Sequence, residues 1–124
     1  MKRYDPNDAP QPAEWLELDE QERILLIERF HRRVREQVES PRAHAIVHAV
    51  VETQLAMDNP MTVRPTLTRL MSEGLDRHEA IHAIGSVLAE YMFQAISGSS
   101  TQETSNAAYA QALAKLTAAS WRAL

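Results

Sequence analysis

The stretch "SPRAHAIVHAVVETQLAMDNP", residues Ser40 to Pro60, has the clearest helix boundaries in the chain. Ser40 is a favourable N-cap residue, and Pro41 occupies the first helical position, where a backbone N–H is not required. The helix must end before Pro60, because the residue preceding a proline is pushed out of the helical region. Apolar residues surround most of its circumference, so we expect this helix to lie at the centre of the fold.

Similar signals flank this segment on both sides. Asp19 followed by Glu22 has the pattern of a capping box and predicts a helix that begins at residue 20 and continues to about residue 39. Its apolar side chains recur at helical spacing along one face. Three further helices are expected over residues 62–74, 76–97 and 106–124.

The pattern predicts an all-α fold, since almost nothing alternates with the period of two that a strand requires. A chain of 124 residues suits one domain, here covering residues 1–124. We expect a bundle of about five helices, in which the second and fourth helices, over 40–59 and 76–97, are parallel and joined by a short return helix. Residues 1–18 should form an extended, proline-rich lead, and residues 98–105 a flexible linker before the last helix.

The composition excludes several kinds of site and partner. The chain has no cysteine, so a bound metal would need imidazole or carboxylate ligands. The net charge of -4 disfavours nucleic acid, and the basic cluster in residues 29–36 is interleaved with glutamates. No run approaches the roughly 20 apolar residues of a membrane span, and the start lacks the apolar core of a secretory signal. We expect a cytoplasmic protein that binds no membrane and no nucleic acid; a homo-oligomer is compatible with these observations.

Four of the five histidines form two pairs with identical spacing, His44 with His48 and His78 with His82. A spacing of four residues places both imidazoles of a pair on one face of a helix, one turn apart, as a shared metal ion requires. Glu52 lies one turn further along the first of these faces. Both pairs fall in the first two turns of their predicted helices.

The predicted topology allows the two pairs to meet. Two parallel helices with a return helix between them have their N-terminal ends on the same side, so His44, His48, His78 and His82 would form one cluster. Glu52 would then be a fifth ligand, or would orient an imidazole through a hydrogen bond. Because imidazole ligands suit zinc, iron or nickel, the sequence predicts a site for a divalent transition metal.

The segment "HEAIH", from His78 to His82, matches the His-Glu-x-x-His signature of zinc metalloproteases. The wider match fails, because Leu88 stands where a metzincin has its third histidine and the sequence predicts no strands to align a substrate. Glu79, the general base of such an enzyme, also has a structural role as the capping-box partner of Asp76. A metalloprotease is therefore disfavoured, and whether the chain is an enzyme is left open.

A dinuclear site of the kind that helical bundles build from Glu-x-x-His elements has less support. Glu79 and His82 supply one such element, but Ala45 stands where the matching glutamate of a second element would be. A mononuclear, histidine-rich site fits the sequence better.

The histidines also have an interpretation without a metal, in which they form hydrogen bonds between helices and bind nothing. The alternative function is then a non-enzymatic protein-interaction module, whose apolar surfaces, including Trp15 and the alanine-rich last helix, engage a partner or a second copy. Replacement of both His48 and His82 by glutamine would abolish metal binding under the first hypothesis and leave association intact under the second.

Two segments carry a family resemblance, "HAIVHAVVETQLAMDNP" followed by Arg64, and "DRHEAIHAIGSVLAEYMF". With them, the chain from Ser40 onward resembles an uncharacterised bacterial family, domain of unknown function 1841. That family similarly shows two histidine pairs, a glutamate-glutamine-leucine segment, and an acidic residue before aromatic and apolar positions. The N-terminal third looks like a shorter replacement for the family's N-terminal helices. The resemblance implies a small helical protein with a shared histidine site and no established activity.

Overall fold

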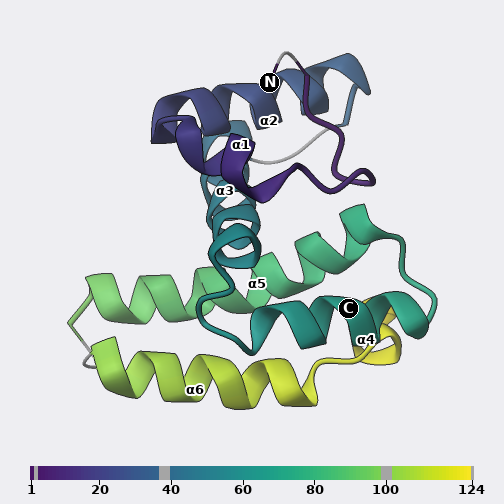
Figure 1. The fold of residues 1–124 in the computed structure, drawn as a ribbon. Helices are drawn as coiled ribbons and strands as arrows, with labels where there is room; N and C mark the ends of the chain where they lie inside the picture. The colour runs from purple at the N-terminus through teal and green to yellow at the C-terminus, as the bar shows by residue number, and fades with distance from the viewer. Residues whose placement is uncertain (2, 37–39, 99–101, 124) are drawn as a thin grey trace.

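The structure, a computed structural model, describes residues 1, 3–36, 40–98 and 102–123, and this part of the chain is helical and contains no strand. The predicted all-α class is confirmed: the protein is a small single-domain helical bundle (Figure 1). The helices are α1 (Pro12–Glu17), α2 (Glu20–Arg33), α3 (Pro41–Met57), α4 (Val63–Ser72), α5 (Arg77–Ile96), α6 (Gln102–Lys115) and α7 (Ala118–Arg122).

The helix starts follow the capping signals of the sequence. The Asp19 side chain accepts a hydrogen bond from the backbone N–H of Glu22, whose side chain in turn accepts from the N–H of Asp19. This is the predicted capping box of α2. At the start of α5, Asp76 accepts a hydrogen bond from the backbone N–H of Glu79 at 2.8 Å. This bond is one half of the predicted capping box, and it involves the backbone of Glu79 rather than its side chain.

The end of α2 differs from the prediction, because the helix stops at Arg33 rather than near residue 39. Arg35 adopts a left-handed conformation with φ of 55°, which ends the helical path. The N–H of Glu36 then bonds to the carbonyl oxygen of His31 at 3.0 Å. Residues 37–39 lie outside the described part of the chain. The early stop turns Glu36 towards the interior of the fold instead of continuing along a solvated helix face.

The C-terminal region also differs from the prediction. Helix α6 begins at Gln102, inside the range expected to be a linker, and residues 99–101 of that range are not described. Residues 102–105 contain neither glycine nor proline, so their composition is compatible with a helix. The predicted last helix is divided near Thr117, which caps α7 through a capping box with Ser120.

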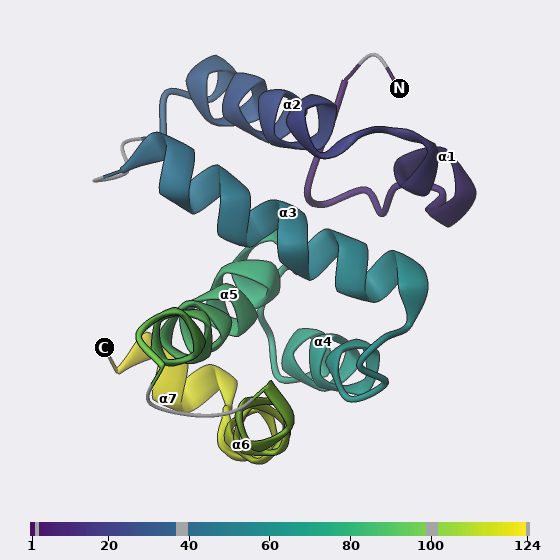
Figure 2. The ribbon, with the colours of Figure 1, turned by 90° about the vertical axis from the view of Figure 1, so that its left-hand side faces the viewer.

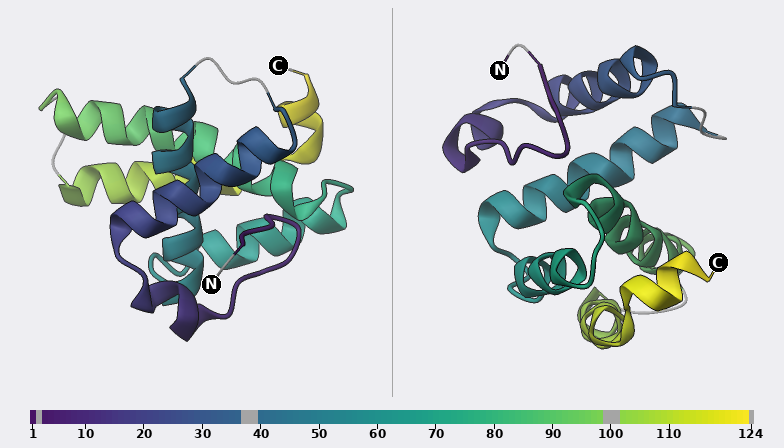
Figure 3. Two further views of the ribbon diagram at one scale, coloured as in Figure 1. Left: turned by 90° about the horizontal axis from the view of Figure 1, so that it is seen from above. Right: turned by 90° about the vertical axis from the view of Figure 1, so that its right-hand side faces the viewer.

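Helix α3 lies between two layers, as its apolar circumference predicts. Helices α1 and α2 cover one side of α3, and α4, α5 and α6 cover the other (Figure 2). Figure 3, left, shows α2 crossing over α3. Each layer has its own apolar core, one containing Trp15 and Ile27 and the other containing Val51 and Ile81. Side chains of α3 that lie at the border between the two layers can therefore contact both of them.

Helices α3 and α5 are joined by the predicted short return helix, α4, but they cross steeply instead of running parallel (Figures 1 and 2). The crossing is close at Gly85, where an added Cβ would lie 3.2 Å from Cγ1 of Val47. The absence of a side chain on Gly85 lets the two helices approach there. Because His48 and His82 lie within one turn of this point, a crossing brings the histidine pairs together as well as a parallel arrangement would.

Among the described residues, no helix has both the length and the apolar character that a membrane-spanning segment needs.

Candidate metal centre

All five histidines of the chain converge where α2, α3 and α5 meet. His31 comes from the last turn of α2, His44 and His48 from α3, and His78 and His82 from α5. Their ring centroids are separated by as little as 4.2 Å for His78 and His82 and 4.6 Å for His44 and His82. The structure therefore brings together the two histidine pairs that the sequence singled out.

Two overlapping groups of potential ligands have all their ligand atoms within 4.8 Å of one another. The first group contains four imidazoles, those of His31, His48, His78 and His82. The second contains three imidazoles and one carboxylate, from His31, Glu36, His44 and His82. Two of these residues, His31 and Glu36, were not among the candidates drawn from the sequence.

His31 could have been found from its position on α2. It follows Ile24 and Ile27 at spacings of seven and four residues, so it continues the buried face of that helix. A histidine on the apolar face of a predicted helix is expected to point into the core, as the two histidine pairs are, so His31 could have been named as a candidate ligand. Glu36 gave no such signal, because its position depends on the left-handed turn at Arg35.

The tautomer of His31 follows from its hydrogen bond to the backbone. Nδ1 of His31 lies 2.9 Å from the carbonyl oxygen of Ile27, one turn earlier. A carbonyl oxygen can only accept, so Nδ1 carries the hydrogen, and in the neutral ring Nε2 has the lone pair. This lone pair faces the other histidines, since Nε2 of His31 is 3.2 Å from Nε2 of His44.

The tautomer of His48 follows from Tyr4. The Tyr4 hydroxyl donates its one hydrogen to a carboxylate oxygen of Glu52 and lies 2.8 Å from Nε2 of His48. Nε2 of His48 must therefore donate to the Tyr4 oxygen, which leaves the lone pair of the neutral ring on Nδ1. Burial, together with the Glu52 carboxylate, raises the pKa of Tyr4 well above its ordinary value, so the phenol keeps its hydrogen.

Glu52 does not face the histidines as a ligand. Its two oxygens each accept a hydrogen bond at 2.8 Å from Arg77, and one of them also accepts from Tyr4. Glu52 is outside both groups of potential ligands. Glu52 reaches His48 indirectly, through the Tyr4 hydroxyl.

The N-terminal segment, predicted as an extended lead with a short turn near Trp15, is part of this arrangement. Tyr4 is 1% exposed and contacts His48 edge-on, with ring centroids 5.4 Å apart. The carbonyl oxygen of Pro6 accepts a hydrogen bond from Arg77, and the Asn7 side chain accepts one from the backbone N–H of His78. No spacing in the sequence relates Tyr4 to the histidines, so sequence analysis could not have found it.

Two buried imidazole nitrogens, Nδ1 of His48 and Nε2 of His78, have no hydrogen-bond partner among the described residues. Buried polar atoms are nearly always paired, and each exception needs an explanation. Both His48 and His78 belong to the group that consists of four imidazoles. Nε2 of His78 lies 3.6 Å from the Glu36 carboxylate, which is too far for a hydrogen bond.

In the second group, which contains His31, Glu36, His44 and His82, the spacing of the imidazole nitrogens suits a metal ion. Nε2 of His44 lies 3.2 Å from Nε2 of His31 and 3.1 Å from Nε2 of His82. Two imidazole ligands of a tetrahedral zinc ion, with zinc–nitrogen bonds of about 2.0–2.1 Å, are about 3.3 Å apart. Without a metal, these contacts require His44 to share one N–H hydrogen between two acceptors, because Nε2 of His31 has no hydrogen to donate.

The environment favours the neutral form of four imidazoles, those of His44, His48, His78 and His82. Burial, followed by repulsion from the neighbouring imidazoles, lowers the pKa of His48 well below its ordinary value. The same causes lower the pKa of His82 to about 3, and burial is also the main cause of the lowered pKa values of His44 and His78. Neutral imidazole is the form that binds a metal ion. These four imidazoles can therefore coordinate a metal ion without first losing protons at neutral pH.

Glu79, the general base in the protease interpretation, is exposed and belongs to neither group of potential ligands among the described residues. His78 and His82 do face the cluster together, as their spacing predicts. The "HEAIH" motif thus contributes two imidazoles, while the backbone N–H of its glutamate donates to the Asp76 side chain.

The fold and the site define a small all-α protein with a partly buried cluster of five histidines. A family model described as domain of unknown function (DUF1841) matches residues 14–115, and the chain belongs to this family. The match begins ahead of Ser40, where the resemblance was seen in the sequence, and includes α2 with its His31. No curated protein and no solved structure matches the chain significantly.

Proposed function

We propose that this protein binds one divalent transition metal ion through His31, His48, His78 and His82. The observation that carries the proposal is the pair of unpartnered buried nitrogens, Nδ1 of His48 and Nε2 of His78, within a group of four imidazoles. A metal ion in this group would accept both lone pairs and remove the cost of burying them without a partner.

Hydrogen counting supports a metal over purely structural histidines. The two tautomers derived above leave lone pairs on Nε2 of His31 and Nδ1 of His48. His44 supplies one hydrogen, which is already directed between His31 and His82. The nitrogens of His31 and His48 that face the cluster are therefore acceptors, which is the state that a metal ligand requires.

Glu36 gives further support from charge. Its carboxylate lies 3.6 Å from Nε2 of His31 and 3.6 Å from Nε2 of His78. This position puts a negatively charged carboxylate beside imidazole nitrogens of two histidines. A divalent cation among these atoms would attract both groups, either with Glu36 as a ligand or with Glu36 as a nearby counter-charge.

Zinc, iron or nickel would suit this donor set, because all three bind imidazole nitrogen. The hydrogen bonds of His31 to Ile27 and of His48 to Tyr4 fix the other ring nitrogen of each ligand, as outer partners do in protein metal sites. When bound, the metal would supply a Lewis-acidic centre at the meeting point of α2, α3 and α5.

The test is elemental analysis of untagged protein purified without chelator, followed by titration with zinc, iron(II) and nickel. The variant H48Q/H82Q should lose the metal, and the matched control E79Q, at an exposed position, should keep it at a near-stoichiometric level. Circular dichroism checks that each variant is folded. A wild-type protein that carries no metal and takes up none of the three would overturn the proposal and favour the alternative, a non-enzymatic interaction module.

A further inference from the structure

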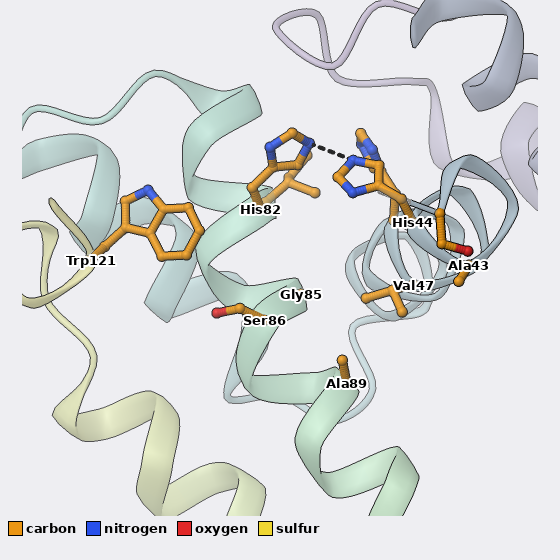
Figure 4. Close-up of a pocket in the computed structure, with 11 residues that line it drawn as sticks. Ala43, His44, Val47, His82, Gly85, Ser86, Ala89 and Trp121 are labelled. Atoms are coloured by element: carbon orange, nitrogen blue, oxygen red, sulfur yellow. Dashed lines mark hydrogen bonds between the residues drawn. The ribbon is translucent and has the colours of Figure 1, made fainter. Parts of the chain in front are cut away.

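A cavity of about 390 Å³ adjoins the histidine cluster, between α3, α5 and α7. Figure 4 shows His44 and Val47 of α3 facing Gly85 and Ala89 of α5, with the ring of Trp121 approaching from α7. Its size lies within the range of about 300–1,000 Å³ that is typical of small-molecule sites, near the lower end.

One end of the cavity is formed by imidazoles. His44, His48 and His82 line it, whereas His31, His78 and Glu36 are not among its lining residues in the described part of the chain. A metal ion bound by His48 and His82 would therefore be approached from this side. On the other side of the metal ion, α2 and the buried ring of His31 would close the site.

The other walls are mostly apolar. Val47, Ile81, Ala89 and Trp121 contribute aliphatic and aromatic surface, and Gly85 exposes helix backbone next to them. The hydroxyl of Ser86 is already bonded to the carbonyl oxygen of Ala83. Apart from the hydroxyl of Ser40, these walls offer a ligand mostly apolar contacts, so the body of a ligand would be apolar.

Charge and hydrogen bonding define the head of the ligand. A divalent ion held by neutral imidazoles keeps its positive charge, and no aspartate or glutamate is among the described residues that line the cavity. A metal ion that takes the lone pairs of His31 and His82 also removes both acceptors from the N–H of His44. That N–H would then donate to an oxygen of the ligand, so a carboxylate meets both the cation and His44.

We propose that this cavity binds a small apolar monocarboxylate, with its carboxylate directed to the metal ion and to His44 and its apolar body against Val47, Ala89 and Trp121. This inference rests on the metal site proposed above. It assigns the cavity as the ligand site of that metal centre.

The experiment uses the full chain loaded with Co²⁺, whose visible absorption reports on its ligands. Benzoate is the probe, benzamide is the neutral control of the same shape, and acetate is the control without an apolar body. Benzoate should change the spectrum saturably, and benzamide should not. Acetate should bind more weakly than benzoate by at least roughly tenfold, which corresponds to about 1.4 kcal/mol of apolar contact.

A variant that fills the cavity gives an independent test. A89F should retain the Co²⁺ spectrum and lose at least roughly tenfold in benzoate affinity. The matched control is A107F, which adds the same ring at an exposed position of α6 outside the cavity. If A89F is not folded, S86L serves in its place, because Ser86 is exposed at the cavity wall.

The outcomes separate the two proposals. A protein that binds Co²⁺ but shows no response to benzoate, or responds equally to benzamide, overturns the carboxylate site and leaves the metal site in place. Equal affinities of A89F and A107F for benzoate would show that it binds elsewhere, which also overturns the inference. A protein that binds no Co²⁺ overturns both proposals.

Discussion

Tyr4 determines which nitrogen of His48 faces the histidine cluster. Its hydroxyl lies 2.8 Å from Nε2 of His48 and gives its own hydrogen to Glu52, so Nδ1 of His48 is left as a buried, unpartnered acceptor. Glu52 is in turn held by Arg77 through both of its oxygens. A chain of contacts thus runs from a buried ion pair, through a phenol, to one potential metal ligand.

Loss of the Tyr4 hydroxyl should weaken metal binding without removing a ligand. In Y4F, Nε2 of His48 loses its acceptor and the preferred tautomer is no longer selected, so we expect metal affinity to fall by about 10–100-fold. Stability of the metal-free protein should fall by about 1–3 kcal/mol, because a buried hydrogen-bonded group is lost. Competition with a chromophoric chelator measures the first effect, and urea denaturation the second.

The control for Y4F is Y91F, whose ring contacts Tyr109 with centroids 6.3 Å apart, away from the histidines. Its metal affinity should equal that of the wild type. Equal affinities of Y4F and the wild type would contradict the positioning role of Tyr4.

Glu52 is expected to contribute to stability rather than to metal ligation. In E52Q, the buried guanidinium of Arg77 loses its counter-charge, and we expect the free energy of unfolding to fall by about 3–5 kcal/mol. Measured at low temperature where E52Q is folded, the metal-to-protein ratio should stay near that of the wild type. Chemical denaturation and elemental analysis test the two parts.

Two comparisons sharpen this prediction. E52Q/R77M should recover part of the lost stability, because it removes the unpaired charge as well. E79Q, at an exposed carboxylate, should change neither quantity. A folded E52Q protein without metal would show instead that Glu52 is a ligand, as the first of its two predicted roles requires.

His31 is expected to be needed for metal binding, although it has no histidine partner four residues away on its own helix. It belongs to both groups of potential ligands, whereas His44 belongs to one. Loss of a residue that only hydrogen-bonds to a metal ligand lowers affinity by about 10–100-fold. We expect H31Q, which removes a ligand, to lower metal affinity by more than roughly 100-fold, and H44Q to lower it less. Isothermal titration with zinc measures both. If H44Q lowers zinc affinity more than H31Q does, the ligands would instead be the four histidines predicted from the sequence, His44, His48, His78 and His82.

The metal-free protein should lose stability as pH falls. The folded-state pKa of His82 is lowered to about 3 from the ordinary value of 6.5, so between these values the unfolded chain binds more protons than the folded one. The free energy of unfolding is then highest above about pH 6.5 and decreases as pH drops towards 3. The lowered pKa values of His44, His48 and His78 act in the same direction.

Urea denaturation in the presence of chelator, at a series of pH values, measures this dependence. H82Q should show a smaller loss of stability over the same interval, because one of the responsible groups is absent. A stability that is constant or increases from pH 7 towards pH 4 would show that the histidines are not held neutral by burial. With metal bound, protons compete for the imidazoles, so metal release should accompany the loss of stability.

Most of the secondary structure could be predicted from local signals. The capping boxes, the proline at the start of α3 and the prolines and glycines between helices act over a few residues, so they appear in the sequence. The end of α2 was missed because the left-handed turn at Arg35 has no glycine or asparagine to indicate it. The steep crossing of α3 and α5 was missed because helix periodicity contains no information about crossing angles.

The sequence by itself determined the helical class, the order of the helices and the two histidine pairs, because spacing along one helix decides which side chains share a face. Tertiary structure decided that the pairs meet, that His31 and Glu36 join them, and that Glu52 pairs with Arg77 instead of facing the cluster. It also placed Tyr4 against His48, from a residue 44 positions away. Such contacts depend on how separate helices pack, and the close approach at Gly85 and the turn after α2 set that packing.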